Sequence, residues 1–144
     1  MGLVESLADD KKKDAVIADV VKLVDEEVAS KGGLSGIALK AGYAAVKGVK
    51  PGFVQSVVKK LLPDFAAKLD PFWTEGLKDG RPVPYMEKEK SRVADALLSV
   101  TDTKIDGAQS DLVKGTYKKL RGSAKKNVEE AVPRLARVVE KYST

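Results

Sequence analysis

The sequence predicts an all-α domain, and three features indicate it. Apolar residues recur every three to four positions along most of the chain, which places them on one side of a helix. Strict alternation of apolar and polar residues, the signature of a half-buried strand, is absent apart from short valine runs. Glycine and proline cluster at a few places, as expected for helix ends and loops. We therefore expect a single domain over residues 1–144, with about seven short-to-medium helices in an irregular, partly orthogonal bundle.

The first long helix is expected over residues 11–30. Asp10 fits its N-cap position, and Gly32-Gly33 follows it as a stop signal. Its apolar residues recur at helical spacing and lie on one stripe that faces the core: Val16, Ile17, Val20, Val24 and Val28.

The segment Leu34–Gly48 is the predicted close-packing helix. It is built largely from small residues, among them Gly36, Ala41, Gly42 and Ala45. A glycine inside a helix costs about 1 kcal/mol relative to alanine, so another helix must approach the backbone closely enough to offset this cost. That second helix could belong to the same molecule or to the partner in a homodimer.

Proline and glycine predict the remaining boundaries. A third helix begins at Pro51, and Pro63 ends or bends it. The clearest loop covers residues 79–84, and the next helix runs from Pro84 to Val100. After a break at 102–107, Gly122-Ser123 indicates a further helix end, and Pro133 a kink in the last helix.

Four stretches carry a resemblance to a known family: Leu34-Ser35-Gly36 through Phe53, Leu61-Leu62-Pro63-Asp64-Phe65, Asp70-Pro71-Phe72-Trp73 and Tyr117-Lys118-Lys119-Leu120-Arg121. The chain resembles, over nearly its whole length, an uncharacterised bacterial family of small all-helical proteins described as a domain of unknown function. The resemblance implies a helical fold and no particular activity, and no functional residue is carried over from it.

Charge is unevenly distributed around the net value of +5. Residues 1–30 hold four lysines and eight carboxylates, a net −4, whereas residues 111–144 hold nine basic and four acidic residues, a net +5. The acidic first helix could therefore lie against basic later helices within one molecule, with each exposed ion pair contributing about 0–1 kcal/mol.

The densest basic stretch has no acid between Asp111 and Glu129 and forms a candidate anion-binding patch: Lys114, Lys118, Lys119, Arg121, Lys125 and Lys126. Such a patch can bind nucleic-acid phosphates or acidic lipid, or it can be a solvated face that keeps the protein in solution. Lysine predominates over arginine, which disfavours the reading of base edges.

The chain has no histidine and no cysteine. Thiolate nucleophiles, disulfides, iron–sulfur clusters and ordinary zinc sites are thereby excluded, and so is the commonest general base at neutral pH. Tyr43 and Lys47 share the spacing of the acid/base pair of short-chain dehydrogenases, but the Rossmann unit that this chemistry requires is missing. We therefore expect no enzymatic activity, no cofactor and no metal.

The length and apolar character of the segments predict no transmembrane helix and a cytoplasmic location. The leading hypothesis is a non-enzymatic protein with an interaction or structural role, which could associate as a homodimer. A weak anionic partner of the basic patch is the alternative. A third hypothesis is a small-ligand site at the aromatic residues Phe65, Phe72 and Trp73, although such clusters more often belong to the core.

Overall fold

A computed structural model describes residues 3–7, 9, 11–108 and 110–143 of the chain. Within these residues every regular element is a helix, which confirms the predicted all-α class. The elements follow in chain order: α1 (Leu3–Leu7), α2 (Lys13–Ser30), α3 (Gly33–Lys47), α4 (Phe53–Asp79), α5 (Pro82–Lys88), α6 (Lys90–Lys104), the short 3-10 helix η1 (Ile105–Gly107) and α7 (Asp111–Ser143).

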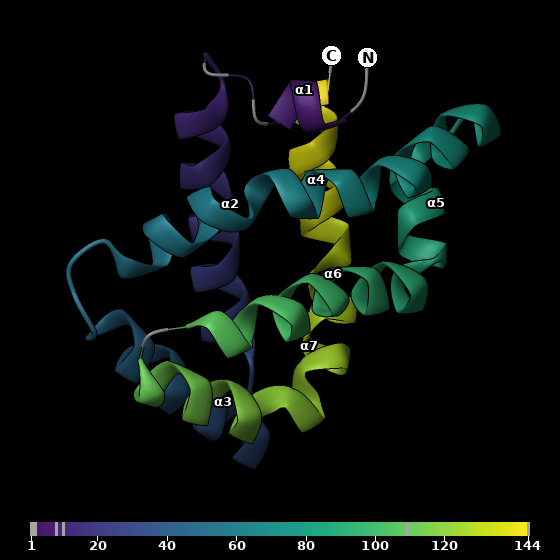
Figure 1. Cartoon of the computed structure of the whole chain (residues 1–144). Coiled ribbons are helices and arrows are strands. Elements are labelled where there is room, and N and C mark those ends of the chain that lie inside the picture. The colour runs from purple at the N-terminus through teal and green to yellow at the C-terminus, as the bar shows by residue number, and fades with distance from the viewer. Residues whose placement is uncertain (1–2, 8, 10, 109, 144) are drawn as a thin grey trace.

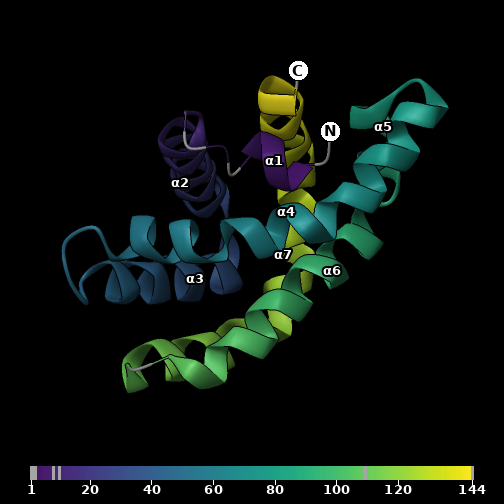
Figure 2. The same cartoon turned by 45° about the horizontal axis from the view of Figure 1, so that its top comes forward.

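The long helix α7 organises the fold. It contacts α1, α2, α3, α5 and α6. In Figure 1, α2 and the yellow C-terminal half of α7 stand side by side, and α4 crosses both of them. Figure 2 shows α3 below the N-terminal half of α4, with α6 running obliquely beneath the rest of α4. The N-terminal half of α7 therefore lies with α3 and α6, and its C-terminal half with α1 and α2.

The core lies where α4, α5, α6 and the C-terminal half of α7 meet. Met86 of α5, Val93 of α6 and Val132 of α7 are fully buried there. Val16 and Ile17 add the apolar stripe of α2, as the spacing of that helix predicts. Asp10, the predicted N-cap, lies outside the described residues, and Lys12 occupies the N-cap position of α2.

The helix α1 closes one end of this core, and its existence is not evident in the sequence. Leu3 and Leu7 are buried against it, and the backbone N–H of Leu3 donates to a carboxylate oxygen of Asp70 in α4 at 3.2 Å. A helix of five residues is too short to be stable alone, so its two leucines and this bond hold it in place.

The prediction that Pro63 ends the third helix is wrong. The helix α4 continues through both Pro63 and Pro71. Each proline removes one backbone hydrogen bond, to the carbonyl group four residues earlier, on Lys59 and Ala67 respectively. Both prolines and both of these residues are exposed, so water can hydrate the freed carbonyl groups. The opposite side of α4 buries a large apolar surface, which offsets the loss: Val58, Leu61, Leu62, Ala66, Leu69, Phe72 and Trp73.

Three other boundaries also differ from the prediction. Gly80, at φ +84°, ends α4, and the predicted loop is shortened because Pro82 already begins α5. The helix predicted from Pro84 to Val100 is divided at Glu89 into α5 and α6. The end predicted at Gly122 is absent, because α7 is continuous from Asp111 to Ser143 and includes Pro133. Apolar packing along α7 on α2, α3, α5 and α6 offsets the cost of about 1 kcal/mol of this glycine.

Candidate functional site

The predicted basic patch divides into two sets of residues. Within the window 114–126 of α7, the exposed residues are four lysines and two glycines and no others: Lys114, Gly115, Lys118, Lys119, Gly122 and Lys126. We call these six residues the lysine face. Its four lysines make no ion pair within 4.0 Å among the residues that the structure describes. Asp111 precedes the face and Glu129 follows it.

The other two members of the predicted patch, Arg121 and Lys125, join α7 to α6. The Arg121 guanidinium donates two hydrogen bonds of 2.9 Å to the two carboxylate oxygens of Asp102. Lys125 donates to Asp95 at 3.2 Å. These bonds give both cations an acceptor inside the molecule, so the two are fixed in helix packing and are less available to a partner.

All four tyrosines of the chain donate their hydroxyl proton to a carboxylate on a neighbouring helix. The pairs join α3 to α2, α5 to α4, α7 to α6 and α7 to α2: Tyr43–Asp25, Tyr85–Glu75, Tyr117–Asp102 and Tyr142–Asp19. Burial and the bond to Asp25 raise the pKa of Tyr43, and burial and the bond to Asp102 raise the pKa of Tyr117. These phenols are therefore held protonated as structural donors, and the arrangement does not favour their use as bases.

The predicted pairing of the acidic first helix with later basic segments is present along α2 and the C-terminal half of α7. Lys141 donates to Asp19 at 2.9 Å, and Arg134 lies 3.4 Å from both Glu26 and Glu27. A bond of the opposite sense joins the same two helices: Lys31, just after α2, donates to Glu130 of α7 at 2.6 Å. Asp19, Glu26 and Glu27 of α2 thus face basic residues of the C-terminal half of α7, whereas Asp25 pairs with Lys47 of α3.

These interhelical bonds predict a loss of stability in acid. Hydrogen bonds from Tyr142 and Lys141 lower the pKa of Asp19, and those from Arg121 and Tyr117 lower the pKa of Asp102. Their contribution is complete above the ordinary pKa of 3.8 and is lost as the pH falls through the lower folded-state pKa. Thermal unfolding followed by circular dichroism should show the melting temperature falling between about pH 5 and pH 2.

The double variant Asp19→Asn with Asp102→Asn tests whether these two carboxylates cause the acid sensitivity, because it removes both titrating groups. Its melting temperature should be lower at neutral pH and should fall less on acidification than that of the unmodified protein. Asp79→Asn, at an exposed carboxylate at the end of α4, is the control and should retain the unmodified pH profile. A double variant with an unchanged acid profile would place the acid sensitivity elsewhere.

The four small residues predicted for close packing have different surroundings. A Cβ atom on Gly42 would lie 2.9 Å from Thr116 and 3.0 Å from Leu120, so this glycine allows α3 to approach α7. A Cβ atom on Gly36 would lie 2.8 Å from the backbone of Lys31, which makes this glycine a requirement of the turn before α3. Ala45 is half-buried, whereas Ala41 is exposed. The helix-packing role is therefore clearest at Gly42.

The other side of α3 is exposed and largely apolar. Its exposed apolar residues, together with the glycine that follows the helix, form what we call the outer face of α3: Ile37, Ala38, Ala41, Ala44 and Gly48. Two exposed lysines of the same helix, Lys40 and Lys47, border this face. The Ile37 side chain is 65% exposed, more than any other exposed large apolar residue of the described chain. A face of this kind is typical of a surface that another helix covers.

Two hollows lie beside these helices. One, of about 220 Å³, lies between α3 and α7 and has an apolar lining that includes Leu39, Val46 and Leu120. The other, of about 360 Å³, lies between α2 and the start of α4, with Ile17 and Val21 as its floor. Both are open to solvent.

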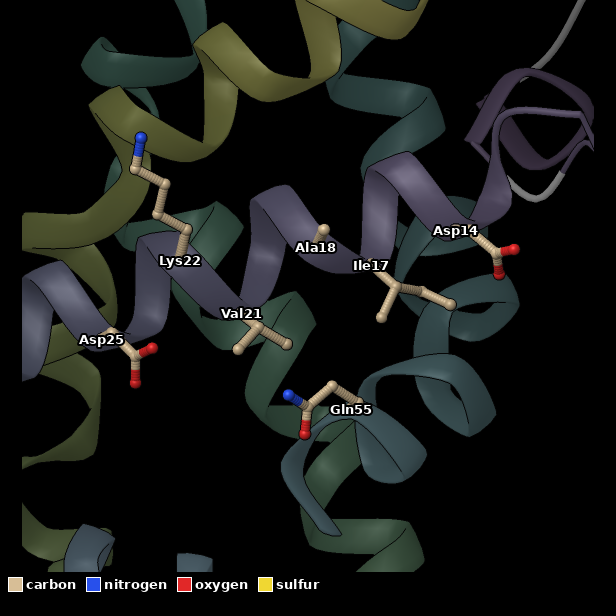
Figure 3. A pocket seen from close by; sticks show the side chains of 7 residues that line it. All are labelled: Asp14, Ile17, Ala18, Val21, Lys22, Asp25 and Gln55. Carbon is tan, nitrogen blue, oxygen red and sulfur yellow. The ribbon is translucent and has the colours of Figure 1, made fainter. Parts of the chain in front are cut away.

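Figure 3 shows that the polar groups of the second hollow do not converge. Asp14 and Asp25 lie at its two ends, separated by about 16 Å along the axis of α2, and Lys22 points away from Gln55. The Asp25 carboxylate already accepts a bond from Tyr43 at 2.6 Å. An active site would need an acid, a base or an oxyanion donor directed at one point, and this hollow does not provide that arrangement.

The aromatic residues predicted to line a ligand pocket lie mainly in the core. Phe72 is 8% exposed and Trp73 is 5% exposed, and both belong to the main apolar cluster. Phe65 is half-buried. The two hollows are lined by other residues, and ligand binding near Trp73 stays a prediction.

Among the described residues, no three aspartate or glutamate side chains come together as a group that could hold a metal ion. Across the same part of the chain, no helix has both the length and the apolar character needed to cross a bilayer.

Comparison with known proteins shows the family to which the chain belongs. The profile described as a family of unknown function (DUF6918) matches residues 3–143, nearly the entire chain. The chain belongs to this family. The predicted membership of an uncharacterised family is thereby confirmed. No curated protein and no solved structure matches this DUF6918 chain.

Proposed function

We propose that this DUF6918 protein is a non-enzymatic interaction protein that pairs with a second copy of itself through the outer face of α3. The cytoplasmic location predicted from the sequence is part of the same proposal. The observation that carries the proposal is that the apolar outer face of α3 is exposed to solvent. The chain also has a larger solvent-accessible surface than a compact monomer of its mass.

The spacing of the outer face supports a helical partner. Ile37, Ala41, Ala44 and Gly48 follow one another at intervals of four, three and four residues. This is the alternation by which one helix packs along another. Because most of these residues are small, two helix backbones can approach closely and gain dispersion contacts along their length. The lysines of α3, Lys40 and Lys47, lie outside this row and would remain hydrated.

The total surface supports an association of standard size. A compact monomer of 15.4 kDa exposes about 7,200 Å². This chain exposes 8361 Å², an excess of roughly 1,200 Å². A standard interface buries about 800 Å² of each partner, so covering part of this excess would be sufficient for a stable dimer.

A second copy is the occupant that this face suits best. In a dimer with twofold symmetry, the same patch meets itself, so a patch must be complementary to its own copy. The residues of the outer face itself carry no charge, and the lysines that border it, Lys40 and Lys47, can extend from the rim of such an interface into solvent. A partner with a strongly charged surface would leave most of its charges poorly hydrated against these apolar residues.

The test is the mass in solution, measured by size-exclusion chromatography with light scattering. The unmodified protein should give about 31 kDa, twice the mass of the chain. The substitution Ile37→Glu places a charge in the interface and should give a monomer with unchanged helix content, because Ile37 is largely exposed within one chain. Lys40→Gln is the matched control, since it lowers the net charge by the same unit on the same helix and should remain dimeric.

An unmodified protein that is a monomer at high concentration would overturn the proposal. A dimer that persists in Ile37→Glu would place the interface elsewhere and would also overturn it.

A further inference from the structure

We propose that the lysine face of α7 binds the phosphodiester backbone of double-stranded nucleic acid without reading its sequence. This inference goes beyond the proposed self-association and does not depend on it. The outer face of α3 and the lysine face of α7 lie on different helices and share no residue, so both surfaces can act in one molecule.

The four lysines of the face make no ion pair within 4.0 Å among the described residues, and Lys126 has only a longer-range attraction to Glu130, whose own partner is Lys31. Lys114 and Lys118 are four positions apart on one helix, where like charges destabilise the helix slightly. Arg121 and Lys125, on the same helix, do have acidic partners on α6. The exposed lysines thus form the part of the basic segment that internal packing does not employ, which is the expected arrangement for a surface that meets an external anion.

Packing inside the molecule does not explain why two positions of the face are glycine. A Cβ atom on Gly115 or Gly122 would meet nothing within 4 Å, in contrast to Gly42, where it would meet two side chains of α7. The two residues are seven positions apart, so they lie on the same side of α7 about 10 Å from each other. Their missing side chains allow an extended strand to approach the helix backbone between the lysines.

The composition of the face selects the phosphodiester backbone of a duplex. Specific reading of base edges favours arginine, asparagine and glutamine, whose planar groups bond two atoms of a base, and the exposed positions of 114–126 contain none of these. Single-strand binding relies on aromatic stacking, but Tyr117, the aromatic residue in this window, donates its hydroxyl to Asp102 and lies beside the α3 hollow. Insertion into a membrane surface requires several large apolar side chains beside the basic ones; the window 114–126 exposes none, and Leu112, just before it, is the one exposed leucine of this helix among the described residues.

The dimensions fit a duplex. Lys114 and Lys126 are separated by about 18 Å along the helix, which corresponds to about five phosphates of one strand. Four lysine–phosphate contacts predict a slope of about −3.6 in a plot of log affinity against log salt concentration. The affinity should therefore fall about 150-fold between about 50 and 200 mM salt.

The experiment measures binding of a fluorescent mixed-sequence DNA duplex by anisotropy across this salt range. The test variant carries four substitutions on the lysine face: Lys114→Gln, Lys118→Gln, Lys119→Gln and Lys126→Gln. The control carries four substitutions of exposed lysines on α4: Lys59→Gln, Lys60→Gln, Lys68→Gln and Lys78→Gln. Both variants change the net charge from +5 to +1, so they differ only in where the charge is removed. Circular dichroism checks that both are folded.

We expect the control to retain most of the affinity and its salt slope, and the test variant to lose both. The variant Gly115→Leu with Gly122→Leu keeps every charge and should also bind more weakly, because its side chains hold the strand away from the helix. Equal losses in the test and control variants would show binding by net charge alone and would overturn the proposal. Binding to vesicles of phosphatidylcholine and phosphatidylserine with none to the duplex would overturn it as well.

Discussion

Replacing Trp73 with alanine is expected to lower the free energy of unfolding by about 3–5 kcal/mol. The side chain is 5% exposed and belongs to the main core cluster, so its removal leaves a cavity that the surrounding helices fill only in part. Typical domains are stable by about 5–15 kcal/mol, which makes this loss a large share of the total. Urea unfolding followed by circular dichroism measures it directly.

Leu77→Ala is the matched control on the same helix. Leu77 is 58% exposed, and its truncation should change the free energy of unfolding by less than about 0.5 kcal/mol. The comparison also addresses the small-ligand hypothesis for the aromatic residues. A ligand-binding role would lead to a Trp73→Ala protein of nearly unchanged stability that has lost a ligand, and that result would contradict the core assignment of Trp73.

Helical periodicity predicted much of the fold, and the failures have a common cause. The apolar stripe of α2 and the bounds of α3 follow from local spacing and end signals, which are properties of short sequence segments. Pro63, Pro71 and Gly122 are local breakers that did not break their helices. Whether a breaker acts depends on the apolar burial that competes with it, and that burial comes from helices distant in the sequence.

The candidate site was predictable to the level of the segment and not of the residue. Counting charges identified the stretch that contains the lysine face, because charge density is a local property. Separating Arg121 and Lys125 from the rest required knowledge of Asp102 and Asp95, which lie on another helix, 19 and 30 positions away. The helix Leu34–Gly48 was predicted to pack closely against another helix, but which of its sides is left uncovered could not be predicted, since exposure is decided by what packs against a helix.

The glycines of this chain also differ by surroundings, and alanine substitutions can reveal this. A Cβ atom on Gly76 would lie 2.7 Å from the Cα atom of Pro82, at the point where α5 folds back onto α4. A backbone atom cannot rotate away as a flexible side chain can, so α5 would have to shift. Gly76→Ala should therefore lower the free energy of unfolding by about 1–3 kcal/mol in urea unfolding, although alanine itself favours the helix.

Gly122→Ala makes the same chemical change where the space is open, and it should raise the free energy of unfolding by about 1 kcal/mol. The opposite signs separate the two explanations for a helical glycine: contact with another backbone at Gly76, and an absence of internal contact at Gly122. A Gly76→Ala protein as stable as Gly122→Ala would show that α5 can move without cost. A destabilised Gly122→Ala protein would mean that this part of α7 packs against the chain itself, and the lysine face would then lose its opening for a phosphate strand.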